Sequence, residues 1–117
     1  MDYGNSFWIE MERLALTSPI IIDRPKGSSH PRYPEAIYPL DYGYLQDTTA
    51  NDGDGIDVWI GPSARKILTG ILCTFDTIQR DAEIKRLIGC TKDDIDVIRA
   101  FHSPTHTLYM PNPGNVR

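Results

Sequence analysis

The stretch Tyr38–Gly61, YPLDYGYLQDTTANDGDGIDVWIG, is the part of the chain around which the rest is organised. Three aspartates, Asp52, Asp54 and Asp57, fall within six residues and are separated by glycines, and the apolar run Val58–Ile60 follows at once. Closely spaced carboxylates repel one another, so such a cluster either has a cation to neutralise it or is fully solvated. The first question is which of these two states the spacing favours.

An EF-hand calcium loop does not fit the cluster. Asp52 and Asp54 occupy its first two ligand positions, but the next ligand would be Ile56. The glycine that this loop requires is Asp57, and the closing glutamate would fall on Ser63. An Asp-Gly hairpin turn remains open, because such dipeptides favour turns. A turn does not need a third aspartate at the start of a strand, whereas Mg²⁺ prefers carboxylate oxygens on a flexible loop. The spacing therefore favours a metal site.

Length and composition limit the classes of function. The 117 residues predict one domain, 1–117, with 40% hydrophobic and 24% charged residues. The 12 basic and 16 acidic residues give a net charge of −4, which argues against nucleic acid as a partner. No apolar run approaches a membrane span, and the N-terminus does not resemble a signal peptide. Two cysteines, Cys73 and Cys90, do not make a disulfide framework, so a cytoplasmic location is expected.

The N-terminal third predicts a helix, a strand and a long loop. A helix capped by Asn5 or Ser6 is expected to run to about Leu16. Its apolar stripe comprises Phe7, Trp8, Met11 and Leu14 and is expected to pack on the body of the domain or on another subunit. Phe7, Trp8 and Met11 are the candidate subunit contact, from which we expect a homo-oligomer. Ile20–Ile22 reads as a strand that ends at Asp23. Arg24–Glu35 is rich in Pro, Gly and Ser and is the most basic segment, either a solvated loop or an arm that faces an anion.

The C-terminal half predicts a hairpin, a helix and a last strand. Ile67–Phe75 and Glu83–Ile88 read as the two strands of the hairpin. Thr91 followed by Asp94 resembles a capping box, and the helix that it starts is expected to end near His102. Thr105–Met110 is a possible strand, followed by a frayed tail. The pattern predicts an α+β domain built on a small sheet or barrel.

Other candidate chemistry is sparse. Asp76 and Asp81 bracket the hairpin connection and are able to bring two more carboxylates to the same place, although each alone reads as a solvated turn residue. The sequence has no phosphate-binding glycine loop and no Cys/His zinc spacing. His102 and His106 flank a Ser-Pro turn and are expected at the surface.

Two motifs resemble the soluble, magnesium-dependent inorganic pyrophosphatases. Tyr38–Gly43, YPLDYG, is similar to that family's Y-P-x-N-Y-G, and Asp52–Asp57, DGDGID, to its DGDP-x-D. Asp76 and Asp81 match the later pair of metal-binding aspartates in that family. The resemblance extends over about 20–101 and implies a small OB-like antiparallel β-barrel with two flanking helices.

The resemblance also implies a metal centre and a water nucleophile. It assigns Asp52, Asp57 and Asp81 to activating Mg²⁺, for which Mn²⁺ is a possible substitute, and Asp76 to a further metal that arrives with the substrate. It assigns Asp54 to the orientation or deprotonation of the attacking water. Hydrolysis of a phosphoanhydride requires such an activated nucleophile together with charge neutralisation.

The same resemblance implies a site for pyrophosphate or phosphate, and here the chain departs from the family. Tyr42 and Tyr38 belong to the phosphate-facing set, and Arg32 takes the part of a lysine. A hairpin that carries a phosphate-binding arginine is missing, so Lys26 and Lys85 are the expected replacements together with Arg32.

Several family positions also carry a different residue. Asp23 and Asp41 replace a glutamate and an asparagine, and Gly55 replaces a proline. Glu83 stands where a lysine is expected, with Lys85 two residues further on the same strand face. The expectation is therefore hydrolysis of pyrophosphate or of another phosphoanhydride. The alternative is a metal- and phosphate-binding relative that turns over poorly.

Overall fold

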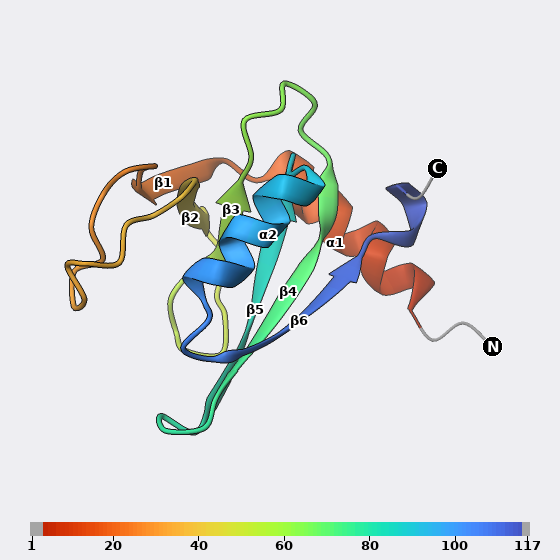
Figure 1. The fold of residues 1–117 in the computed structure, drawn as a ribbon. Coiled ribbons are helices and arrows are strands. Elements are labelled where there is room, and N and C mark those ends of the chain that lie inside the picture. The colour runs from red at the N-terminus through yellow and green to blue at the C-terminus, as the bar shows by residue number, and fades with distance from the viewer. Residues whose placement is uncertain (1–3, 116–117) are drawn as a thin grey trace.

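The structure, a computed structural model, describes residues 4–115, and within that range two α-helices pack on a six-stranded sheet (Figure 1). The mixed α+β class is therefore confirmed. The elements are α1 Asn5–Thr17, β1 Ile20–Arg24, β2 Asp41–Leu45, β3 Ile56–Ile60, β4 Leu68–Asp76, β5 Asp81–Ile88, α2 Lys92–Phe101, β6 His106–Pro111 and the short 3₁₀ helix η1 Pro113–Asn115.

The sheet is open. Its strand order is β1-β2-β3-β5-β4-β6, so β1 and β6 lie at the two edges. The sheet is not closed, and the expected barrel is not confirmed. Neighbouring strands are antiparallel except β3 and β5, which run parallel with Val58, Trp59 and Ile60 opposite Arg86, Leu87 and Ile88. The expectation of a wholly antiparallel sheet is wrong at this pair, which the chain reaches by a crossover through β4.

The two helices lie on opposite faces of the sheet (Figure 1). Beneath α2 lies an aromatic and aliphatic core in which Trp59, Leu87 and Ile98 are fully buried. On the other face Ala15 of α1 joins a second core cluster that contains Val58 of β3. Because alternate residues of a strand point to opposite faces, β3 contributes Trp59 to one core and Val58 to the other.

The hairpin β4–β5 is confirmed and extends well beyond the helices (Figure 1). On the face that carries α1, the part of the hairpin and of β6 outside the α1 core remains accessible. Phe75 is 50% exposed, Ile84 40% and Leu108 59%. This half-open apolar surface forms part of the cleft described below.

Both helix starts were predicted, but only one with the right cap. In α2 the Thr91 hydroxyl accepts from the Asp94 amide and the Asp94 carboxylate accepts from the Thr91 amide, so the capping box is confirmed. In α1 the N-cap is Gly4 without a side-chain cap, so capping by Asn5 or Ser6 is wrong. The N-terminal helix of 13 residues nevertheless lies where the apolar stripe predicted it.

The expected frayed tail is anchored within the described residues. Asn112 is 3% exposed, and its side-chain amide donates to Glu12 at 2.9 Å and to the Leu68 carbonyl at 3.0 Å. These contacts tie the segment after β6 to α1 and β4. The rest of the tail, residues 116–117, lies outside the described residues.

Two glycines bring the ends of β3 and β5 together. The Gly61 amide donates to the Ile88 carbonyl at 2.8 Å, and a Cβ atom on Gly61 would lie 2.1 Å from the Gly89 oxygen. Gly89 itself has φ +63°, a conformation that favours glycine. The strands pair only over their last three residues, so the beginnings of β3 and β5 are not hydrogen-bonded to each other and leave room for a cleft.

Candidate functional site

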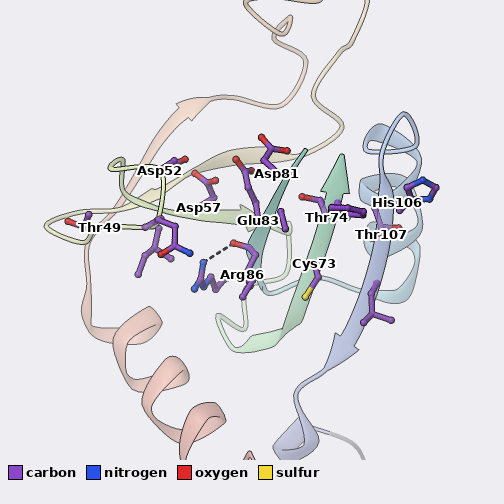
Figure 2. Close-up of a pocket in the computed structure, with 17 residues that line it drawn as sticks. Thr49, Asp52, Asp57, Cys73, Thr74, Asp81, Glu83, Arg86, His106 and Thr107 are labelled. Atoms are coloured by element: carbon purple, nitrogen blue, oxygen red, sulfur yellow. Dashed lines mark hydrogen bonds between the residues drawn. The ribbon is translucent and has the colours of Figure 1, made fainter. Parts of the chain in front are cut away.

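Carboxylates from two neighbouring strands and one loop meet where β3 and β5 begin. Ligand oxygens of Asp52, Asp57 and Glu83 all lie within 4.8 Å of one another. Asp81 lines the same cleft from β5, on the same face as Glu83, because the two are separated by one residue. Figure 2 shows these labelled carboxylates at the acidic end of the cleft, with Asp81 also on β5.

Local backbone geometry holds the loop aspartate in place. The Asp52 carboxylate accepts from the Asp54 amide at 2.9 Å, and Gly53 between them has φ +89°. An aspartate that bonds the backbone two residues ahead, followed by a glycine in a left-handed conformation, is a typical turn. Asp57 follows on β3 opposite Tyr44, so the strand register fixes its position.

Lys85 lies beneath the carboxylates and is 6% exposed. Its ammonium nitrogen donates to Asp57 Oδ2 at 3.0 Å, to Glu83 Oε2 at 2.5 Å and to the Tyr42 hydroxyl at 2.7 Å. A lysine ammonium has three N–H donors, and all three have an acceptor here. The side chain is therefore satisfied by the protein itself and does not reach into solvent.

The protonation states of Lys85 and Tyr42 follow from these contacts. Burial disfavours the charged amine, yet the pKa of Lys85 is raised because interactions with Tyr42 and Asp57 favour the ammonium form. Burial raises the pKa of the Tyr42 phenol as well, because a phenolate would be poorly solvated there. Lys85 is thus a cation and Tyr42 a neutral hydroxyl at neutral pH.

The cleft measures about 840 Å³ and has an acidic rim and a largely apolar lining. Of the lining residues in the described part of the chain, only Arg86 is a lysine or arginine. One of its terminal nitrogens donates to the Ile84 carbonyl at 2.7 Å, while its Nε is buried without a hydrogen-bond partner (Figure 2). Any anion in this cleft therefore meets one guanidinium from the protein.

The structure brings together three of the five predicted acidic residues. Asp52, Asp57 and Asp81 line the cleft. Asp54 is exposed on the loop and is not among the lining residues. Asp76 lies at the tip of the hairpin, where its carboxylate accepts from two backbone amides of the turn. This position corresponds to the solvated turn residue that the sequence also allowed.

The predicted phosphate-facing residues are scattered. Lys26 and Arg32 are exposed on the basic loop, and neither lines the cleft. His30 organises that loop by accepting from the Arg32 amide at 3.0 Å. Tyr38 is 5% exposed and packs on Phe101, with ring centroids 4.7 Å apart, so it serves as a core residue. The basic loop and the acidic cluster do not form one continuous site in this structure.

His102 does not lie at the surface as expected. Its Nε2 accepts from the Trp59 indole at 3.2 Å, and burial lowers the pKa of His102 to about 4. Trp59 in turn packs edge-on against Tyr42, with ring centroids 4.8 Å apart. His102 is thus a half-buried neutral imidazole that packs against the core residue Trp59, whereas His106 is exposed as predicted.

Two residues of the cleft were not recognised in the sequence. Glu83 was read only as the replacement of a lysine, although its i+2 spacing from Asp81 on a predicted strand places both on one face. Arg86 gave no signal, since its neighbour Lys85 was the expected cation. The pairing of β5 with β3 decides whether Lys85 or Arg86 points toward the cleft.

Comparison with known proteins adds no family. A scan against protein-family models and a search of curated proteins both find no match for this chain. No helix in the described range is long and apolar enough to cross a membrane. The resemblance to pyrophosphatases therefore stays a prediction that rests on the motif residues.

Proposed function

We propose that this chain is a divalent-cation-dependent hydrolase of phosphoanhydrides, with inorganic pyrophosphate as the first substrate to test. The observation that carries the proposal is the convergence of Asp52, Asp57 and Glu83, whose oxygens lie within 4.8 Å of one another beside Asp81. Carboxylates that repel one another are gathered here from a loop and two strands. Such an arrangement suits a hard cation.

The donor set fits magnesium or manganese. Mg²⁺ binds carboxylate oxygens at 2.0–2.1 Å, so two ligands on opposite sides lie about 4.2 Å apart. The observed spread of up to 4.8 Å requires only small side-chain rotations to reach that geometry. When bound, the ion would lower the pKa of a water and offset charge on phosphoryl oxygens.

The chain's own residues supply the remaining roles. Asp81 lies on the rim, where it is able to accept a proton from an attacking water. Arg86 offers a guanidinium to an anion in the cleft. The assignment of Asp54 to the water and of Asp76 to a further metal remains part of the proposal and requires movement of both segments.

The topology supports an OB-like origin within the same proposal. OB-type domains are five-stranded, partly open Greek-key barrels. The order β1-β2-β3-β5-β4 with one parallel pair gives such a barrel when β1 meets β4, but here β6 pairs with that edge of β4. The site would then lie at one end of an opened barrel.

A second candidate is a metal- and phosphate-binding protein with little turnover. The scattered cations favour it, because transition-state charge on a phosphoryl group needs positive partners. Only Arg86 lines the cleft as a lysine or arginine among the described residues, and the predicted Lys26 and Arg32 lie outside it. The two candidates share the metal site and differ in rate.

One assay separates them. Phosphate release from pyrophosphate is measured with Mg²⁺ and with Mn²⁺ for the native protein and for Asp57→Asn. The matched control is Asp96→Asn, the same change at an exposed position of α2. Metal-dependent release by the native protein and the control, absent in Asp57→Asn, supports hydrolysis. Equal background phosphate release by all three proteins contradicts hydrolysis. Phosphate release from another phosphoanhydride but not from pyrophosphate would change only the substrate assignment.

Two expectations about the whole protein accompany the proposal. Cys73 and Cys90 are free thiols, as expected for a cytoplasmic protein. Phe7 is 40% exposed on α1, and Ile9 and Leu16 are each 49% exposed, which is consistent with a homo-oligomeric contact through this helix. Both remain to be tested by localisation and by sedimentation.

A further inference from the structure

The lysine beneath the acidic cluster has the surroundings of a bound ion. Lys85 is 6% exposed, and its nitrogen has three oxygen partners at 2.5–3.0 Å from Asp57, Glu83 and Tyr42. Two of these partners belong to the triad that fits a metal. A buried ammonium must be paired, so these two carboxylates are already neutralised in part without any metal.

A charge count shows what remains for an external ion. The triad Asp52, Asp57 and Glu83 carries three negative charges, and the Lys85 ammonium contributes one positive charge. Two negative charges are left, which match one divalent ion. Lys85 bonds one oxygen of Asp57 and one of Glu83, so it leaves the second oxygen of each carboxylate without a bond to the ammonium.

We propose that Lys85 is a built-in counter-ion that takes the place of a second cation and limits the Asp52–Asp57–Glu83 cluster to a single divalent ion of reduced affinity. The proposal rests on the metal site proposed above. It replaces the phosphate-binding role predicted for Lys85 from the sequence. The side chain cannot reach substrate while all three of its donors are bound to the protein.

The physical reason for reduced affinity is charge repulsion. The ammonium lies within hydrogen-bond distance of two candidate ligands, so a divalent ion bound to the same side chains would be a few ångströms away from it. Dissolved salt screens such repulsion poorly because the ammonium is buried. The same ammonium keeps the metal-free cluster from repelling itself, so it stabilises the fold without an ion.

The test measures Mn²⁺ binding to the folded protein by electron paramagnetic resonance of the free ion. Thermal melts measure the stability of the same proteins. Lys85→Met keeps an unbranched side chain only one heavy atom shorter and removes its charge, and Lys92→Met at an exposed position of α2 is the matched control. We expect one Mn²⁺ per native chain and at least about tenfold tighter binding by Lys85→Met. Without metal, this variant should melt roughly 10 °C lower than the native protein and recover much of that loss in Mn²⁺.

Other outcomes contradict the proposal. Two Mn²⁺ per native chain, or equal or weaker binding by Lys85→Met, would show that Lys85 does not replace a cation. The double variant Asp57→Asn with Lys85→Met should lose the added affinity. If Lys85→Met does not fold alone, refolding with millimolar Mn²⁺ decides the matter, since rescue supports the proposal and failure contradicts it.

The outcome is separable from the proposed hydrolysis. Binding and melting require no turnover, so the counter-ion role stands if Mn²⁺ binding behaves as described while pyrophosphate is not cleaved. Conversely, metal-dependent cleavage together with unchanged Mn²⁺ affinity in Lys85→Met would support the enzyme and overturn the counter-ion.

Discussion

The acidic cluster and the basic loop were expected to be two halves of one site, and the structure treats them differently. Asp57 and Glu83 lie on strands, and Lys85 links them within the protein. Lys26 and Arg32 lie on the loop between β1 and β2, are exposed and do not line the cleft. Strand register fixes the first group, whereas the second depends on a segment held mainly by its own turns.

The largest expected difference between the two regions is in catalysis. Glu83→Gln should lower the Mg²⁺-dependent rate of pyrophosphate hydrolysis by roughly 100-fold or more, because it removes a charged group of the cluster. Arg32→Gln should change it by less than about threefold, because its side chain lies outside the cleft. Steady-state phosphate release at saturating Mg²⁺ checks both, and equal losses would return the basic loop to the site.

The pH dependence of stability should separate the core histidine from the loop histidine. Burial lowers the pKa of His102 to about 4, so the folded protein keeps it neutral where the unfolded chain, with a pKa near 6.5, binds a proton. The free energy of unfolding should therefore fall as the pH drops from about 6.5 to 4, by about 1–3 kcal/mol in total.

Urea titrations at several pH values measure this loss. His102→Gln keeps an acceptor for the Trp59 indole and should flatten the dependence between pH 6.5 and 4. His30→Gln in the basic loop should flatten it less than His102→Gln, because burial and the nearby Arg24 and Arg32 lower the pKa of His30 by a smaller amount. The same slope in all three proteins would mean that His102 is protonated in the folded state at these pH values.

The two hairpin aspartates give a smaller, more local contrast. Asp81→Ala should lower metal-dependent activity by about tenfold, because a carboxylate is lost from the rim of the cleft. Asp76→Ala should leave activity within about threefold but cost about 1 kcal/mol of stability, since two amides of the turn lose their acceptor. The reverse pattern would restore the metal-binding role that the resemblance gave to Asp76.

The smallest effect is expected in the basic loop itself. Lys26→Gln should change the free energy of unfolding by less than about 0.5 kcal/mol, because among residues 4–115 its hydrogen bond is made by the backbone amide, which donates to Asp41 at 2.8 Å. Asp41→Ala removes that acceptor and should cost about 1 kcal/mol. Urea denaturation of the two variants measures this difference, and a larger loss for Lys26→Gln would show that its side chain is bound.

Patterns local in the chain were predictable. The α2 capping box and the β4–β5 hairpin follow from spacing, and each depends on residues close in sequence or on a turn. The placement of Asp52, Asp57 and Asp81 along one cleft was expected from the motif resemblance alone.

What could not be predicted depends on contacts between distant segments. The parallel pairing of β3 with β5 decides that Lys85 is buried and Arg86 faces the cleft, although period-2 alternation alone permits either. The bond between Trp59 and His102 joins residues 43 positions apart. The pairing of β4 with β6 rather than with β1 was likewise not predictable, because it depends on contacts between distant segments.

The contact between Gly61 and Gly89 has a consequence for selectivity among ions. At this contact the backbones that follow β3 and β5 meet with no side chain between them. Asp57 lies on β3 and Glu83 on β5, and Asp57 is about 13 Å along β3 from Gly61. A methyl group added at Gly61 would push its backbone away from that of Gly89 and change the distance between the Asp57 and Glu83 carboxylates. On the metal site proposed above, we expect Gly61→Ala to change the relative affinity for small and large divalent ions, which Mn²⁺ and Ca²⁺ titrations of this variant would measure.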